Sequence, residues 1–157
     1  MKKTPTIYLI CGFLGAGKTT YSKKLAKEKN AIHLNPDEVV MKRYSKEEYE
    51  NNWEACFAET MDFLWQETAS YIKQNKDIIF DVGFWDKASR ISAKEKATKH
   101  GATPIIYYIY APDEILKQRI SLRKGKIAEH NLLHFDDIKK YFEEPSDDET
   151  FITIKNY

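Results

Sequence analysis

Residues 12 to 19 read Gly-Phe-Leu-Gly-Ala-Gly-Lys-Thr and match the phosphate-binding loop pattern G-x-x-x-x-G-K-[ST]. The loop directly follows the apolar run 7–11, which we expect to form a short buried strand. It precedes residues 20–29, which we expect to form a helix. Because the pattern binds phosphates in a strand–loop–helix setting, the motif constrains the chain to an α/β fold with this loop at a strand end.

The composition of the loop explains how it would hold a nucleotide. We expect Gly12, Gly15 and Gly17 to adopt backbone conformations closed to other residues, so that successive N–H groups face a phosphate chain. Lys18 is then predicted to reach the outer phosphates, and the Thr19 hydroxyl to ligate Mg²⁺. A glycine-rich turn with a surface lysine is the alternative. The predicted ATP-binding residues of the loop are Gly12, Phe13, Leu14, Gly15, Ala16, Gly17, Lys18, Thr19 and Thr20.

Length and composition limit the remaining possibilities. The 157 residues are interpreted as a single domain over 1–157. A net charge of +1 gives no basic footprint of the kind that nucleic-acid binding requires. Cys11 and Cys56 follow no metal or disulfide spacing and are expected to be buried in a reducing compartment. Cleavage of the N-terminus as a secretory signal would cut the phosphate loop, and no later stretch is long enough to cross a bilayer, so we expect a cytoplasmic protein without a membrane partner.

Short apolar runs alternate with helical patterns along the whole chain. One helical stripe, at Phe57, Met61, Leu64, Trp65, Thr68 and Ile72, is expected to face the core. We expect strands at 7–11, 31–34, 78–81, 103–110 and 151–154, and helices at 20–29, 37–44, 86–100, 113–123 and 134–142, with a longer helical region from Ser45.

Strands that alternate with helices predict a three-layer α/β/α sandwich around a parallel sheet. Ligands of such sheets bind beyond the carboxyl ends of the strands. Four segments follow strand ends and should therefore line one crevice: 12–19, 35–37, 81–85 and the chain from Ala111.

Two aspartates are candidates for phosphoryl-transfer chemistry. Asp81 ends an apolar strand, where a carboxylate can hold Mg²⁺ directly or through water. Its alternative role is a helix cap or a solvated turn residue. Asp37 follows the second strand, opposite the phosphate loop, and is predicted to be the general base, with Asn35 or Glu38 in support. Its alternative role is the N-cap of its own helix. If the Asn variant of Asp37 kept its turnover and that of Asp81 lost it, the base would be Asp81.

Basic residues near the end of the helix at 113–123 are candidates for charge stabilisation. Arg119 and Arg123 are four residues apart and so share a helix face. Together with Lys124 and Lys126 they form a cationic edge beside 124–131, a polar stretch interpreted as a short mobile lid. One or both arginines are predicted to clamp the transferred phosphoryl group. A solvated basic helix end is the alternative.

Several other residues have weaker sequence patterns. Arg90 and Arg43 are further candidates for acceptor binding, and Trp53 for a wall of the substrate cleft. His130 and His134 are four residues apart, but the pattern lacks the glutamate of H-E-x-x-H and phosphoryl transfer needs no zinc. We predict no zinc site there.

With these motifs located, the chain resembles small P-loop kinases of the AAA-domain, or zeta-toxin-like, ATP-binding group. That group is similar to chloramphenicol phosphotransferase and polynucleotide kinase domains. The resemblance covers nearly the whole chain. Its carriers are 12–20 (GFLGAGKTT), 34–38 (LNPDE), 79–84 (IFDVGF), 110–114 (YAPDE), the Arg119 and Arg123 pair, and 142–145 (FEEP).

The resemblance implies a P-loop NTPase fold of the nucleoside-kinase type, with five parallel strands in the order 2-3-1-4-5. It also implies ATP with Mg²⁺ as the donor and a hydroxyl of a small or medium-sized molecule as the acceptor. In relatives the aspartate after the second strand activates that hydroxyl, which here is Asp37. A lid arginine contacts the ATP phosphates, which corresponds to Arg123, and Arg119 would lie nearer the adenine.

Two other functions stay open at this stage. One is a nucleotide-binding switch or adaptor that transfers no phosphoryl group. The other is a polynucleotide 5′-hydroxyl kinase, in which Tyr44, Tyr49, Trp53 and Trp85 would stack on bases. Polynucleotide kinases tend to carry an arginine where this chain has Val40, and the near-zero net charge does not suit a phosphate backbone, so nucleic acid is the less favoured acceptor.

Overall fold

The computed structural model describes residues 2–157. Its centre is a five-stranded sheet with the order β2-β3-β1-β4-β5, in which every neighbouring pair is parallel. The strands are β1 (Thr6–Cys11), β2 (Ile32–Leu34), β3 (Ile78–Gly83), β4 (Thr103–Tyr110) and β5 (Phe151–Lys155). Both the parallel sheet and its strand order, as the sequence and the resemblance imply them, are confirmed.

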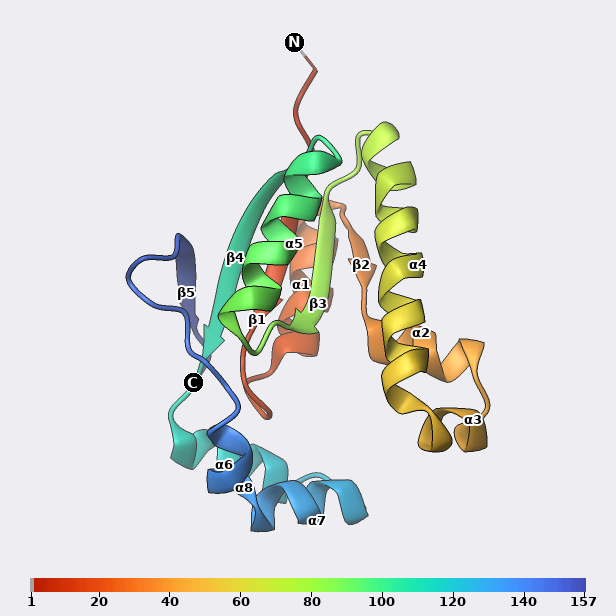
Figure 1. Cartoon of the computed structure of the whole chain (residues 1–157). Coiled ribbons are helices and arrows are strands. Elements are labelled where there is room, and N and C mark those ends of the chain that lie inside the picture. Colours follow the sequence, from red (N-terminus) through yellow and green to blue (C-terminus); the bar gives the residue numbers. More distant parts are fainter. Residues whose placement is uncertain (1) are drawn as a thin grey trace.

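Helices cover both faces of this sheet (Figure 1). Helix α1 (Lys18–Lys29) lies on the face opposite α5 (Lys87–Lys99), and α4 (Trp53–Lys73) runs along the β2 edge of the sheet. Helices α2 (Pro36–Arg43) and α3 (Lys46–Asn51) join β2 to α4. Helices α6 (Asp113–Ser121), α7 (Lys126–Leu133) and α8 (Phe135–Lys139) gather beyond the carboxyl ends of the strands.

The core forms where apolar strand runs meet the helices. The side chains of Ile7, Leu9, Ile10, Ile78 and Ile79 are completely buried, as expected for strands covered on two faces. Both cysteines are buried and free, as predicted. Among residues 2–157, no helix combines the length and the apolar character needed to span a bilayer.

A bulge ends β3 and shapes the nearby loop. Ile10 pairs with Asp81 and Cys11 with Gly83, so that Val82 is an extra residue on β3. Gly83 has a φ of 102°, a conformation that glycine adopts readily, and its carbonyl oxygen accepts a bond from the Gly12 N–H at 3.0 Å. The end of β3 is thereby fixed against the start of the phosphate loop.

Four sequence-based assignments of helices were wrong. Helix α1 begins at Lys18, earlier than 20, and α6 ends at Ser121, so that Arg123 lies outside the helix. The expected polar stretch 124–131 is largely helical as α7, and the expected helix at 134–142 is only the short α8. Among the residues of α7 only Ala128 is buried, so this helix has little of the apolar period from which helices are predicted.

Candidate functional site

The phosphate loop has the backbone that its glycines predict at two of three positions. Gly15 and Gly17 have φ values of 79° and 86°, which side chains rarely tolerate. Gly12 was predicted to share this property and does not. A Cβ atom there would lie 2.8 Å from the Ile109 carbonyl oxygen, so close packing excludes a side chain. The loop therefore combines two left-handed residues with one tight contact against β4.

The carbonyl groups of the loop are held by Arg119 of α6 and by Asn156, which follows β5. Arg119 Nη1 donates to the carbonyl oxygens of Gly15 and Ala16 at 3.2 and 3.3 Å. Asn156 Nδ2 donates to the same Ala16 oxygen at 2.7 Å. With its carbonyls bonded outward, the loop is free to turn its N–H groups inward. No sequence motif marks Asn156, since it is 140 residues from Ala16.

A cavity of about 210 Å³ opens at the carboxyl ends of β1, β2 and β3. It brings together Lys18, Thr19, Asp37, Asp81 and Arg123, which belong to separate motifs of the sequence. The predicted common crevice is therefore present. Its remaining lining comes from Leu14, Gly15, Gly17, Thr20, Asn35 and Val82, and Arg119 is not part of it.

Lys18 is one of the residues that line this cavity. Its Nζ donates to the Phe13 carbonyl oxygen at 2.9 Å. Burial lowers the pKa of Lys18 to about 8, although the negative charges of Asp81 and Asp37 act in the opposite direction. An ammonium in this position gains a full set of partners only when phosphate oxygens enter the cavity.

Asp81 is buried and oriented by two neighbours. Its Oδ2 lies 3.1 Å from His33 Nε2 and accepts a bond from Asn35 Nδ2 at 3.0 Å. Within the described chain its Oδ1 has no hydrogen-bond partner. Neither alternative role, a helix cap or a solvated turn residue, fits this arrangement. His33 was missed because a single histidine in a three-residue strand carries no sequence signal.

The donor set at this position suits magnesium. Asp81 and Thr19 line the same cavity, Asp81 Oδ1 has no partner within the described chain, and Mg²⁺ prefers hard oxygen ligands and usually keeps several waters. Within residues 2–157 no group of three or more His, Cys, Asp and Glu side chains forms a metal site, so a metal here would need the nucleotide as a further ligand.

Asp37 is not the cap of its helix. Asn35 is the N-cap of α2, since its Oδ1 accepts from the Glu38 N–H at 3.2 Å, and Pro36 is the first helical residue. The Asp37 carboxylate is therefore free of that structural role and faces the cavity. Although it is open to solvent on that side, the protein packed around it raises its pKa, and the charge of Asp81 adds to the shift.

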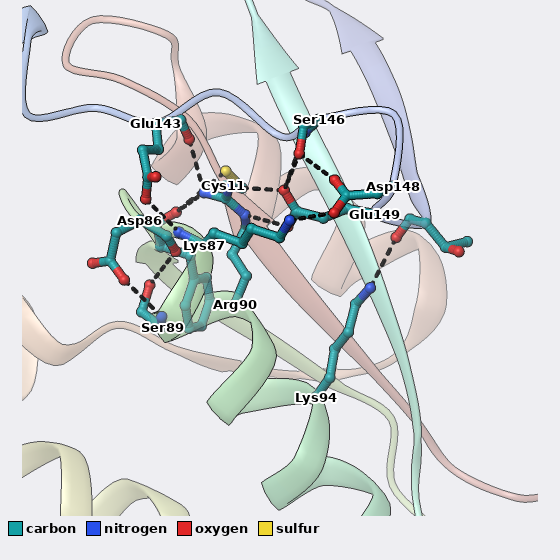
Figure 2. Close-up of polar contacts among 12 residues, drawn as sticks. Cys11, Asp86, Lys87, Ser89, Arg90, Lys94, Glu143, Ser146, Asp148 and Glu149 are labelled. Carbon is teal, nitrogen blue, oxygen red and sulfur yellow. Dashed lines mark hydrogen bonds and ion pairs between the residues drawn. The ribbon is translucent and has the colours of Figure 1, made fainter.

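The prediction that Arg90 binds an acceptor was wrong. Its side chain is 1% exposed, and its Nε and Nη2 donate to the Glu149 carboxylate at 2.7 and 3.0 Å (Figure 2). Its Nη1 donates to the carbonyl oxygens of Phe84 and Glu143 at 3.0 and 2.9 Å. Arg90 instead fastens α5 and the loop after β3 to the segment that precedes β5.

Other candidates are distributed as follows. Arg123 lines the phosphate cavity, whereas Arg43 lies over the Phe63 ring at 4.5 Å and outside that cavity. Glu38 forms a surface ion pair with Lys23 at 3.0 Å. Trp53 is 56% exposed and does not line the phosphate cavity.

The predicted core stripe of α4 is only partly a core. Leu64, Trp65 and Thr68 are buried, but Phe57 and Met61 are half-buried and line a second cavity beside the loop after β3. A 3.6-residue period marks an apolar face but does not distinguish a filled core from a cavity wall.

The chain is similar in fold to several solved kinase structures. No curated protein matched the chain significantly. Among solved structures, a sugar kinase from Janibacter sp. HTCC2649 is 19% identical with a TM-score of 0.63, covering 98% of this chain and 86% of its own. Shikimate kinase from Acinetobacter baumannii is 22% identical with a TM-score of 0.60, covering 99% and 86%.

Kti12 from Chaetomium thermophilum, solved with ADP-AlF₃, is 14% identical with a TM-score of 0.65, covering 95% of this chain and 88% of that one. These likenesses show a shared P-loop kinase fold. A family model described as an AAA domain matches residues 7–145, which is most of the chain. The chain therefore belongs to the AAA domain family of P-loop proteins, as its motifs imply.

Proposed function

We propose that the protein is an ATP-dependent kinase that transfers the γ-phosphoryl group to a hydroxyl of a small or medium-sized molecule. One observation carries the proposal: the phosphate loop and the Asp37 carboxylate, which has no capping role, open into the same cavity. A nucleotide-binding switch needs the loop but does not need a free carboxylate opposite it. An enzyme that deprotonates an acceptor needs both.

In this proposal each residue has one role. Asp37 accepts the proton of the acceptor hydroxyl as its oxygen attacks the γ-phosphorus, and the bond from that phosphorus to the β–γ bridging oxygen breaks to release ADP. Lys18 and Arg123 neutralise charge on the phosphoryl oxygens. His33 and Asn35 hold Asp81 through its Oδ2 and leave its Oδ1 unbonded within the described chain.

Thr19 and Asp81 are the residues that would hold magnesium. A bound Mg²⁺ would supply charge neutralisation for the β- and γ-phosphates. Arg119 is assigned a supporting role, since it bonds the outer carbonyls of the phosphate loop.

Relatives with the same fold support a small acceptor. The neighbours include proteins described as a sugar kinase and a shikimate kinase. Kti12, solved with ADP-AlF₃, supports a nucleotide donor rather than any particular acceptor. The net charge of +1 and the absence of an arginine at Val40 favour a small molecule over an oligonucleotide.

Acceptor-dependent release of ADP tests the proposal. We expect turnover of Mg·ATP to rise at least tenfold with a suitable acceptor, and Asp37→Asn to reduce kcat by about 10²–10⁴, the usual contribution of a general base. ATP affinity should change little. Glu28→Gln, a surface carboxylate paired with Lys24 on α1, serves as the matched control and should retain wild-type turnover. Tight ATP binding with no transfer to sugars, nucleosides, aryl alcohols or oligonucleotide ends would instead identify a switch.

A further inference from the structure

A second cavity adjoins the phosphate cavity and has a different chemistry. It is lined by residues of α4, of α5, and of the end of β3 with the loop that follows, and has a volume of about 400 Å³, within the range of small-molecule sites. Val82, the extra residue of the β3 bulge, lines both cavities. A molecule bound here could therefore extend a substituent past Val82 toward the phosphate loop and Asp37.

The walls of this second cavity are mainly carbon. Phe57, Met61 and Trp65 come from α4, and Phe84 and Trp85 come from the loop after β3. These rings belong to a packed set: the Trp65 centroid lies 4.8 Å from that of Phe80, and the Trp85 centroid lies 5.1 Å from that of Phe13 in the phosphate loop. The aromatic walls are consequently formed before a ligand binds.

Few polar groups are available in the same cavity. They are Asp86, Ser89, Ser92 and Lys96, all on or next to α5. Asp86 and Ser89 already bond one another's backbone, since Asp86 Oδ1 accepts from the Ser89 N–H at 2.7 Å and Ser89 Oγ donates to the Asp86 carbonyl oxygen at 2.8 Å. Ser92 and Lys96 have no hydrogen-bond partner within the described chain.

A lining with many aromatic carbons and few free polar groups disfavours the binding of a polyol. A sugar or a shikimate-like ring would bury several hydroxyls against phenyl and indole carbons, and each hydroxyl left without a partner lowers affinity about 5- to 150-fold. A flat apolar ring loses no hydrogen bonds there and gains aromatic contacts. Its polar substituents would find Ser92 and Lys96 at the rim.

We infer that the phosphoryl acceptor is an alcohol built on an aromatic or heteroaromatic ring, which binds in this second cavity. The inference rests on the proposed kinase function. Phe57 and Trp85 become its specificity-determining residues, and Ser92 marks the exposed edge of the site.

Two experiments test this inference: a comparison of kcat/KM among acceptors, and a substitution that fills the cavity. Thymidine and 3-phenylpropane-1,2-diol are assayed against glucose, gluconate and shikimate, and we expect at least one aromatic alcohol to exceed every polyol by 100-fold in kcat/KM. Ser92→Trp fills the cavity from an exposed position and should raise the KM of that alcohol at least tenfold without changing the KM for ATP. Glu95→Trp, also exposed on α5 but outside the cavity lining, should change neither.

Binding is measured separately by quenching of tryptophan fluorescence with the same two alcohols in the absence of ATP. Saturable quenching that Ser92→Trp abolishes would support this cavity as a site for aromatic alcohols. If none of them were then phosphorylated, the kinase proposal and the acceptor role would fail and the binding site would stand. Preferred turnover of a polyol, with dependence on Asp37, would overturn the aromatic acceptor and leave the kinase intact. The absence of both turnover and quenching with the aromatic alcohols would likewise overturn the aromatic acceptor.

Discussion

Protonation of Lys18 gives the sharpest prediction for nucleotide binding. Burial lowers its pKa to about 8 in the unliganded protein, whereas phosphate oxygens around the ammonium would keep it charged. A lysine with a pKa of about 8 is roughly nine-tenths neutral at pH 9 and one-tenth neutral at pH 7. Binding of ATP should therefore take up about 0.9 proton at pH 9 and about 0.1 proton at pH 7. Over the same range the affinity for ATP should fall about tenfold.

Isothermal titration calorimetry measures this uptake directly. ATP is titrated with Mg²⁺ at pH 9 in two buffers with different ionisation enthalpies, and the difference in observed heat gives the number of protons. The γ-phosphate itself is already ionised there, because its pKa lies near 6 to 7, so it contributes no proton. The matched variant is Lys18→Arg, whose guanidinium stays charged at every accessible pH and should show no uptake.

Two results would refute this reasoning. One is an uptake near zero at pH 9 for the wild-type protein. The other is an uptake that persists in Lys18→Arg, since the proton would then come from a different group. If Lys18→Arg binds too weakly to measure, Lys18→Met with the same two buffers answers the question at higher ATP concentration.

Three further predictions concern the site and its support. The pKa of Asp37 is raised above 3.8, so kcat/KM for the acceptor should increase with pH through an inflection above that value, which a pH–rate profile measures; an inflection at or below 3.8 would contradict it. Hydrogen bonds from Arg90 hold the pKa of Glu149 below 4.5, so the free energy of unfolding should decrease as pH falls below 4.5 through the folded-state pKa. Arg90→Met should lose about 3–5 kcal/mol at pH 7 in urea denaturation, and a loss under about 1 kcal/mol would refute the buried pair. Gly15→Ala places a Cβ atom 2.9 Å from the Leu116 carbonyl oxygen at a φ of 79°, and should weaken ATP binding at least tenfold. Gly101→Ala, with a similar φ of 83° and open space around it, should cost only about 1–2 kcal/mol of stability and keep ATP affinity.

The strands and the phosphate loop could be predicted because each is encoded by a short continuous stretch of sequence. The strands follow from uninterrupted apolar runs such as Ile78 to Phe80, and the phosphate loop follows from the spacing of its glycines and Lys18. The rule that ligands bind beyond the carboxyl ends of parallel strands then brought Asp37 and Asp81 to that loop without any contact information.

The errors arose where distant segments decide the role of a side chain. An arginine such as Arg90 is a residue type that often binds anionic ligands. Its actual partner, Glu149, is 59 residues away, and no local pattern predicts that ion pair. The support that Asn156 gives to Ala16 spans 140 residues. Phe57 and Met61 follow the same period as the buried Leu64, and only the packing of α4 against the sheet separates cavity wall from core. Sequence patterns therefore located the residues that line the phosphate cavity better than the residues that support them.

Transfer of an isotopic label tests the kinase proposal most directly. The protein is incubated with Mg²⁺, ATP that carries oxygen-18 on its γ-phosphoryl group, and a mixture of sugars, nucleosides and aryl alcohols, and the products are analysed by mass spectrometry. We expect the labelled phosphoryl group in an organic phosphate ester, formed by the wild-type protein and lost in Asp37→Asn. Label found only in inorganic phosphate, at the same slow rate with and without acceptors, would show that the protein does not transfer phosphoryl groups to hydroxyls.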